Sequence, residues 1–272
     1  MRSCVVIPTY NERENIEEVI TRVLKNDVNI LIVDDGSPDG TGEIVTKLAE
    51  IHPGRIELVS RSGKQGLGKA YVFGFNKCIA EGYDVICQMD ADLSHDPDVL
   101  DDLISPVLNR QADLVIGSRY IDGGSIPKWT LLRRLLSRGG NLYTRLLLNV
   151  KTHDATAGFR AYNAEFLARV LATGIEAEGY GFQIEMTYCA TRLKGKIIEM
   201  PISFADREHG TSKMGGFIIV EALTKVTLWA LRDRVIAPIK RLFSHKDKKV
   251  ADTNVAVTKI DDETSSSMNQ EI

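Results

Sequence analysis

The sequence predicts an α/β fold in which a mainly parallel sheet is flanked by helices. In the first half of the 272-residue chain, short apolar runs bounded by turn residues alternate with stretches of helical periodicity. Such runs indicate buried strands, and the helices between them indicate parallel βαβ units with right-handed crossovers. The expected strands are residues 3–8, 29–34, 56–60, 113–117 and a run from Val85, and the expected helices are residues 11–25, 41–51, 67–80 and 100–108.

The first helix shows the pattern on which these assignments rest. Its apolar residues recur at helical spacing, and Glu12 and Glu14 lie in the first turn, where the helix dipole favours negative charge. Later in the chain we expect a loop leading into a strand at 154–160, a helix at 181–193 and a last strand at 196–204. Gln183 and Glu185 in that helix either line a site or are polar residues of helix packing.

Composition indicates an ordinary globular protein. The net charge is −3 and 43% of residues are hydrophobic, which argues against a nucleic-acid-binding protein. The four cysteines form no CxxC pair, so neither a zinc site nor a disulfide framework is indicated. The start of the chain runs directly into a strand, and no stretch of 18 apolar residues occurs, so we expect no signal peptide, no transmembrane helix and a cytoplasmic location.

Four loops follow the carboxyl ends of expected strands, and parallel strands place such loops on one rim of the sheet. They are residues 9–12, 35–40, the loop with Asp90 and Asp92, and 118–120. Two carboxylates one residue apart repel each other, and a hard cation such as Mg²⁺ or Mn²⁺ that bridges a diphosphate explains them. A solvated acidic turn is the alternative explanation.

The other rim loops carry further candidate ligands. Asp35 is able to accept hydrogen bonds from a nucleobase or ribose, and the alternative is that Asp35 and Asp39 only shape the turn. Arg119 suits bidentate contact with a phosphate, and an ordinary surface charge is its alternative. Residues 63–70 satisfy most of a P-loop, but Ala70 lacks the hydroxyl that binds Mg²⁺, so a nucleotide triphosphate site is disfavoured.

Several of these motifs occur together and in a characteristic order. They are PTYNE at 8–12, VDDGS at 33–37, DAD at 90–92 and GSR at 117–119. In this order they resemble the family-2 glycosyltransferases. DDGSPDGT at 34–41, GLGKAY at 66–71, MDADLSHDP at 89–97, SRGGN at 137–141 and FADREHGTSK at 204–213 are similar to the dolichyl- and polyprenyl-phosphate mannose synthases within that family. The resemblance covers about residues 3–230.

The resemblance implies a GT-A fold, a GDP-mannose donor, a divalent cation (Mg²⁺ or Mn²⁺) and a polyprenyl (dolichyl-type) phosphate acceptor. Carried over position by position, it assigns the guanosine to Pro8, Tyr10, Glu12, Val33 and Asp35. It assigns the diphosphate and mannose, through the metal, to Asp90, Ala91 and Asp92. The predicted metal residues are Asp90, Asp92 and Ser94. Ser94 stands where some relatives place Gln as a metal-side ligand, and water is the alternative third ligand, because a hydroxyl reaches less far than an amide.

The resemblance also implies the residues that meet phosphate charge. Arg119, Arg207 and Lys213 would contact donor or acceptor phosphate, and Arg133 and Ser137 would grip the acceptor phosphate. Asp92, Arg119, Arg133 and Ser137 are therefore the expected catalytic group. A lipid phosphate is already anionic near neutral pH, since its second pKa is about 6, so we expect no dedicated base and inversion to a β-linked product.

Residues 123–153 contain six Lys and Arg residues, many leucines and no Asp or Glu. A helix that is basic on one side and leucine-rich on another indicates a membrane-surface helix, and a core-packed helix with a solvated basic face is the alternative. We expect a catalytic domain over 1–215, an interfacial amphipathic region over 216–244 and a disordered tail over 245–272. Residues 206–216 are expected to close over the donor.

Membrane contact is thus expected to be peripheral, on the cytosolic face, or supplied by a small membrane-protein partner. Two other functions remain open from the sequence. A polyprenyl-phosphate transferase for another sugar nucleotide, such as UDP-glucose, shares every motif, because sugar identity depends on pocket shape. A noncatalytic nucleotide-sugar binding protein would tolerate loss of Asp92.

Overall fold

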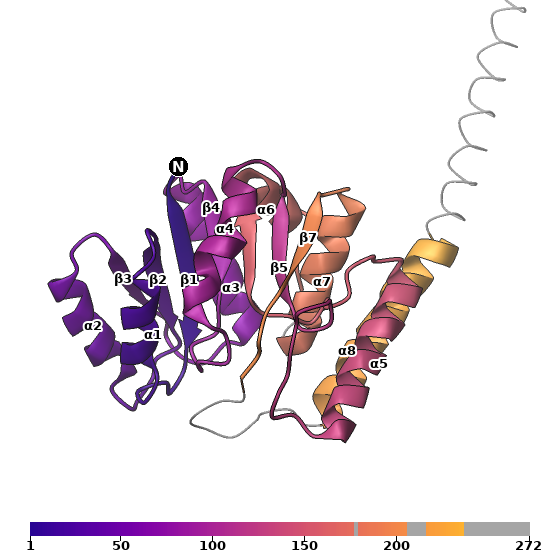
Figure 1. Ribbon diagram of the computed structural model, residues 1–272, viewed down its shortest axis with the longest axis horizontal. Coiled ribbons are helices and arrows are strands. Elements are labelled where there is room, and N and C mark those ends of the chain that lie inside the picture. Colours follow the sequence, from indigo (N-terminus) through magenta and orange to yellow (C-terminus); the bar gives the residue numbers. More distant parts are fainter. Residues whose placement is uncertain (177–178, 206–215, 237–272) are drawn as a thin grey trace, which may run out of the picture. The chain divides into compact units, whose positions relative to one another are not determined.

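A seven-stranded sheet with helices on both faces forms the core of the first compact unit (Figure 1). The computed structural model describes residues 1–176, 179–205 and 216–236. The chain forms two compact units, residues 1–225 and 226–272, and the second is described over residues 226–236. The expected α/β fold with a mainly parallel sheet is confirmed.

The sheet is parallel apart from one strand. The strands are β1 (Ser3–Thr9), β2 (Asn29–Asp34), β3 (Ile56–Ser60), β4 (Val85–Gln88), β5 (Leu114–Ser118), β6 (Arg160–Asn163) and β7 (Ile197–Pro201). Their order across the sheet is β3-β2-β1-β4-β6-β5-β7. Only β6 runs antiparallel, to both β4 and β5, among the strands that the structure describes. The amino end of β6 therefore lies on the same rim as the carboxyl ends of its neighbours.

The helices largely agree with the sequence pattern. They are α1 (Ile16–Val23), α2 (Thr41–Ile51), α3 (Leu67–Ala80), α4 (Leu100–Leu108), α5 (Leu131–Leu148), α6 (Ala164–Leu171), α7 (Gly179–Arg192) and α8 (Gly216–Leu231), with a 3₁₀ turn at Pro97–Val99 and a π turn at Arg232–Ile236. The first helix begins later than residue 11, because Asn11 has a φ of 59° and the next residues form a turn. The last strand ends at Pro201 rather than residue 204.

The two faces of the sheet are covered by different helices. Val5 and Ile7 belong to a core that also contains the apolar faces of α1, α2 and α4. On the other face, α3 crosses so close to the sheet that a Cβ at Gly74 would lie 2.4 Å from a methyl of Val6. This tight packing fixes the start of α3, and the loop before it, relative to the carboxyl ends of β1 and β2.

The expectations for the C-terminal part stay predictions. A helix is present at Gly216–Leu231, within the expected interfacial region. Residues 206–215, which include Arg207 and Lys213, and residues 237–272, which include the expected tail, lie outside the described residues. Among the residues that the structure describes, no helix is both long enough and apolar enough to cross a membrane.

Candidate active site

The nucleoside-side residues meet where β1 and β2 end. These strands are in register up to the pair Thr9 and Asp34. The Thr9 hydroxyl donates to Asp34 Oδ1 at 2.7 Å, and Ser37 donates to the same carboxylate from its N–H and its hydroxyl. Asp34 is therefore a structural residue that folds the loop after β2, and it leaves the neighbouring Asp35 at the rim.

Asp35 is not an isolated acceptor. Arg61 donates to it from Nε at 2.7 Å and from Nη2 at 3.2 Å, and the Gln65 N–H donates at 3.2 Å. The Lys64 ammonium also lies 4.9 Å from the centre of the Tyr10 ring. The loop after β3 thus closes over the predicted guanosine residues, a contact that the sequence did not reveal.

The remaining guanosine candidates lie beside this group. Pro8 and Val33 are paired across β1 and β2, one residue before the strand ends. The Glu12 N–H donates to the Thr41 hydroxyl at 3.0 Å, and the Glu12 carboxylate accepts from Asn15 at 3.0 Å. The structure therefore brings together all five residues that the sequence assigned to the nucleoside.

The acidic bend lies directly beyond β4. The Tyr71 hydroxyl, from α3, donates to Asp90 Oδ1 at 2.6 Å, and the Ser94 N–H donates to Asp92 Oδ1 at 3.1 Å. Leu93 between them has a φ of 58°, so the chain reverses within the motif. Burial and the adjacent Asp90 charge both raise the pKa of Tyr71, which keeps this phenol protonated as a donor.

The donor atoms of the bend suit a hard dication. Asp92 and Ser94 are buried, whereas the side chain of Asp90 is 32% exposed and so reaches the rim. Within the described residues the Ser94 hydroxyl has no hydrogen-bond partner, as expected of an oxygen that completes its contacts with a ligand. No cluster of three His, Cys, Asp or Glu side chains suited to a metal occurs in the described parts of the chain.

Arg119, a candidate ligand of the acceptor phosphate, forms an ion pair inside the protein and is not an ordinary surface charge. Arg119 is buried, and it donates to Asp154 from Nε, from Nη2 and from its backbone N–H at 2.7, 2.7 and 3.0 Å. Burial alone raises the pKa of Asp154, but the Arg119 charge and its hydrogen bonds outweigh it and hold that pKa below its usual value. The rings of Tyr120, Trp129 and Phe204 surround the guanidinium at 5.3–5.4 Å.

Arg133 and Ser137 lie on the first turns of α5, next to this group. The Arg133 guanidinium stacks 3.8 Å from the centre of the Trp129 ring, and the Tyr120 hydroxyl donates to Ser137 Oγ at 2.6 Å. The helix is anchored further along by Asn141, which accepts from the Ala155 N–H at 2.8 Å and donates to the Thr156 hydroxyl at 3.2 Å. The segment 154–156 therefore connects Arg119 to α5.

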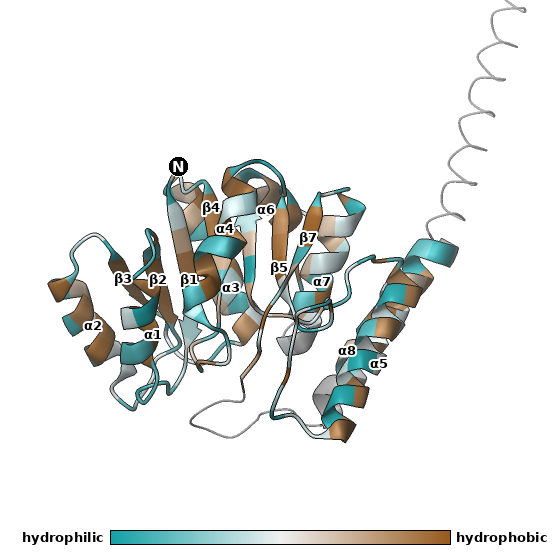
Figure 2. Ribbon diagram, viewed as in Figure 1, coloured by the Kyte–Doolittle hydropathy of each residue, from teal (hydrophilic) through white to brown (hydrophobic). Residues whose placement is uncertain are grey.

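Helix α5 buries two polar residues and leaves six of its eight leucines exposed. Its buried residues are Asn141, Thr144 and Leu148. Six leucines point outward with exposed fractions from 52% at Leu136 to 73% at Leu131, and the others are Leu132, Leu135, Leu142 and Leu146. Figure 2 shows the resulting mixture of hydrophobic and hydrophilic residues along the helix. These six leucines do not pack in the core of the described residues, which favours the surface-helix prediction over a core-packed helix.

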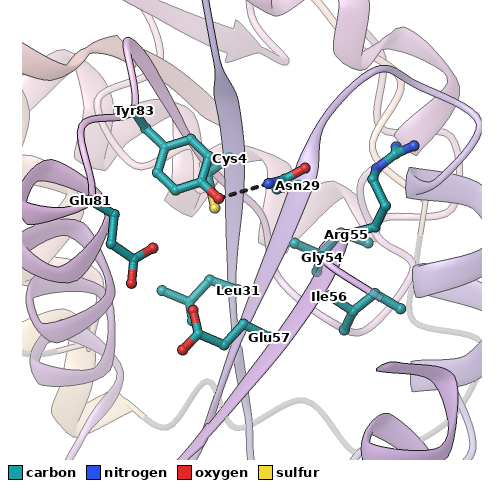
Figure 3. A pocket seen from close by; sticks show the side chains of 10 residues that line it. Cys4, Asn29, Leu31, Gly54, Arg55, Ile56, Glu57, Glu81 and Tyr83 are labelled. Carbon is teal, nitrogen blue, oxygen red and sulfur yellow. Dashed lines mark hydrogen bonds between the residues drawn. The ribbon is translucent and has the colours of Figure 1, made fainter. Parts of the chain in front are cut away.

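A cavity of about 280 Å³ lies at the opposite, amino ends of β1–β3 (Figure 3). Cys4, Asn29, Glu57, Glu81 and Tyr83 are among its lining residues, and no predicted site residue lines it. Four of its polar side chains have partners: Asn29 donates to the Tyr83 hydroxyl at 2.8 Å, and Lys77, which does not line the cavity, bridges Glu57 and Glu81. This cavity is therefore not the candidate active site.

The sequence missed several residues that hold the site together. They are Arg61, Gln65, Tyr71, His95, Trp129, Asn141 and Asp154. Three of them lie in motifs quoted above: Tyr71 in GLGKAY, His95 in MDADLSHDP and Asn141 in SRGGN. Asp154 begins the segment DATAGFR at 154–160. None of these segments says which strand end its polar residue will reach.

Comparison with known proteins places these features in a family. The family model described as glycosyl transferase family 2 matches residues 4–171. The chain is 46% identical over 236 residues to a polyprenol monophosphomannose synthase of Mycolicibacterium smegmatis, covering 86% of this chain and 89% of the relative. It is 45% identical over 237 residues to an undecaprenyl-phosphate mannosyltransferase of Micrococcus luteus, covering 86% of this chain and 96% of the relative.

Solved structures share the fold at lower identity. A crystal structure described only as a mycobacterial protein has a TM-score of 0.59 at 21% identity, covering 86% of this chain and 74% of that one. A mannosyltransferase from Pyrobaculum calidifontis, in complex with GDP-mannose and Mn²⁺, has a TM-score of 0.51 at 19% identity, covering 92% and 80%. With the family model matching more than half of its residues, the chain belongs to glycosyl transferase family 2.

Proposed function

We propose that the protein transfers mannose from GDP-mannose to a polyprenyl monophosphate, giving a β-linked polyprenyl-phosphate mannose. The names of the two curated relatives support both the sugar and the acceptor. The observation that carries the proposal is the order of predicted residues across the sheet. Guanosine residues lie on β2 and β1, the acidic bend follows β4, and the acceptor residues follow β5. The parts of the two substrates would lie along the rim in the order in which they are bonded.

The acidic bend serves the leaving group in this proposal. A Mg²⁺ or Mn²⁺ ion held by Asp90, Asp92 and Ser94 would offset the charge that develops on the departing diphosphate. Tyr71 fixes the Asp90 carboxylate through the 2.6 Å hydrogen bond, so this oxygen needs little rearrangement when the donor binds. Arg207 and Lys213, which lie outside the described residues, are proposed to add positive charge to the same diphosphate.

The acceptor side needs positioning rather than proton removal. An oxygen of the lipid phosphate forms a bond to the anomeric carbon while the bond from that carbon to GDP breaks, and GDP leaves with the electron pair. Because the phosphomonoester is mostly dianionic above a pKa of about 6, no proton has to be removed. Arg119, Arg133 and Ser137 are proposed to hold it, with Asp154 fixing the orientation of Arg119.

The exposed leucines of α5 support contact with a membrane surface, where a polyprenyl acceptor resides. Leu131, Leu132, Leu135 and Leu136 lie beside Arg133, Arg134 and Arg138, a pattern suited to the interface of an anionic bilayer. We propose that α5 lies on the cytosolic face of the membrane, with its acceptor-binding residues toward the site. A small membrane-protein partner remains a prediction.

The direct test is incubation with GDP-[¹⁴C]mannose, Mn²⁺ or Mg²⁺ and a polyprenyl phosphate, followed by measurement of label in the organic phase. We expect labelled lipid that depends on the acceptor and the metal, and a loss of about a hundredfold or more in Asp92→Asn. In a parallel incubation with UDP-[¹⁴C]glucose, labelled lipid from this donor alone would favour another sugar nucleotide. Tight GDP-mannose binding without transfer under any of these conditions would favour a noncatalytic binding protein.

A further inference from the structure

We propose that His95, Gln183 and Asp90 form a subsite, above the Cα of Gly158, that binds hydroxyl groups of the transferred sugar. The proposal rests on the proposed donor, a sugar nucleotide, and adds residues that would determine which sugar is accepted. None of the motif assignments made from the sequence gives His95 or Gly158 a role.

The first observation is a buried histidine whose ring nitrogens lack partners. The His95 residue is 2% exposed, and neither Nδ1 nor Nε2 makes a hydrogen bond within the described residues. The ring packs against Phe159 and Phe204, with ring centres 5.2 and 5.3 Å away. Leaving buried polar atoms unpaired costs free energy, so such groups are normally completed by a ligand or an ordered water.

The second observation is that three polar side chains converge on one small volume. A Cβ added to Gly158 would lie 3.2 Å from Asp90 Oδ2, 3.5 Å from His95 Nε2 and 3.6 Å from Gln183 Nε2. Gln183 is 4% exposed, and its Oε1 also has no partner in the described part of the chain. The Asp90 and His95 atoms are 3.7 Å apart, too far for a direct hydrogen bond but close enough for one hydroxyl to contact both.

The position of this volume indicates the sugar rather than another part of the donor. Gly158 precedes β6, which lies between β4 and β5 in the sheet. The subsite therefore lies between the acidic bend, proposed for the diphosphate, and Arg119, proposed for the acceptor phosphate. A sugar bonded to the diphosphate and attacked by the acceptor must occupy that interval. Neutral hydroxyls match its mixed set of a carboxylate, an amide and an imidazole, all able to hydrogen-bond.

The lack of a side chain at Gly158 leaves room for the sugar. A ligand atom in contact with the Gly158 Cα would occupy the space of the missing Cβ, next to Asp90, His95 and Gln183. The Asp90 side chain, 32% exposed, opens the volume to the rim. The Tyr71 ring, whose hydroxyl donates to Asp90 Oδ1, stacks on the ring of Phe182 with ring centres 5.8 Å apart.

The test compares binding of GDP with binding of GDP-mannose, both with Mn²⁺ and without acceptor, by isothermal titration calorimetry. His95→Phe keeps a ring between Phe159 and Phe204 but removes both nitrogens, and Gln183→Met removes the amide. We expect each variant to bind GDP-mannose about tenfold more weakly, the effect of losing roughly one hydrogen bond, while GDP affinity changes less than about twofold. Gly158→Ala, which fills the volume, should show the same selective loss.

His52→Phe is the matched control, because His52 caps the far end of α2, and it should change neither affinity. Stability gives a second readout. Since the His95 nitrogens make no hydrogen bond to any described residue, His95→Phe should unfold at the same or a higher urea concentration than the parent. Deoxy analogues of GDP-mannose then identify the hydroxyl: the analogue lacking it should bind the parent and His95→Phe equally.

Several outcomes would overturn the subsite. Equal losses of GDP and GDP-mannose affinity would assign His95 a structural role. Lower stability with unchanged donor affinity would mean that the nitrogens hold an ordered water only. Unchanged affinities and stability would also reject it. These results differ from failure of the proposed function, in which the parent protein itself binds neither GDP nor GDP-mannose.

Discussion

Arg119 and Asp154 form a buried ion pair, with Nε to Oδ2 and Nη2 to Oδ1 distances of 2.7 Å each, between residues 35 positions apart in the sequence. Two parallel hydrogen bonds fix the plane of the guanidinium as well as its position. The Thr156 hydroxyl also accepts from Nη2 at 2.8 Å, and Thr156 is bonded to Asn141 of α5. The pair therefore connects the end of β5 to the helix that carries the acceptor residues.

Asp154→Ala is expected to lower the free energy of unfolding by about 3–5 kcal/mol, because it leaves the buried Arg119 charge without its partner. The loss is this large because both partners are buried: Asp154 is fully buried and Arg119 is 7% exposed. Urea unfolding followed by circular dichroism measures the change. Asp27→Ala, at an exposed position, is the control and should change stability by less than about 0.5 kcal/mol.

The same pair predicts a pH dependence of stability. The pKa of Asp154 is lowered in the folded state, so its contribution is fully present above its ordinary value of 3.8 and is lost as the pH falls through the folded pKa. The stability difference between the parent and Asp154→Asn should be constant from about pH 7 to 5 and shrink below about pH 4. Unfolding at a series of pH values tests this, and a difference that grows toward low pH would contradict the assignment.

Tyr71→Phe is expected to weaken binding of the metal although it removes no proposed metal ligand. Removing the hydroxyl takes away the 2.6 Å hydrogen bond that fixes Asp90, so we expect the Mn²⁺ concentration needed for half-maximal GDP binding to rise several-fold, roughly the effect of 1 kcal/mol. Fluorescence titration of GDP binding at varied Mn²⁺ measures this. Tyr83→Phe loses a hydrogen bond to Asn29 at the far end of the sheet and should leave the midpoint unchanged.

Ser94→Ala separates metal binding from folding. The Ser94 hydroxyl is buried and has no partner within the described residues, so its removal should leave the metal-free protein as stable as the parent. If the hydroxyl is a metal-side ligand, the Mn²⁺ midpoint for GDP binding should rise in the same titration. An unchanged midpoint would mean that Ser94 does not contribute to the site.

Replacing exposed leucines of α5 should reduce membrane binding and leave the fold intact. Leu132→Ser with Leu136→Ser changes residues that are 68% and 52% exposed, so the free energy of unfolding should change by less than about 1 kcal/mol in total. Cosedimentation with vesicles containing anionic lipid should fall by about tenfold. Leu148→Ser, at a residue 8% exposed, should instead destabilise the protein. Undiminished vesicle binding by the double variant would refute the surface role of α5.

Local patterns in the sequence were sufficient for the strand–helix alternation and for the placement of the acidic bend. The contacts that build the site depend on pairing across the sheet, which local patterns do not contain. The position of β6 between β4 and β5 brings Asp154 to Arg119, and the loop after β3 brings Arg61 to Asp35. In the sequence, Asp35 and Arg119 therefore look like unpaired ligand candidates. In the structure, each forms an ion pair with a residue distant in the sequence.

The reversed direction of β6 has a practical consequence for changing the enzyme. Strand β5 ends and β6 begins on the same rim, so residues 119–159 form an excursion that leaves the sheet and returns to it at that rim. Nearly everything proposed for lipid recognition, including α5, lies in this excursion, whereas the nucleotide half precedes it. Exchanging residues 119–159 between related transferases should therefore exchange the specificity for the lipid acceptor and leave the specificity for the nucleotide unchanged.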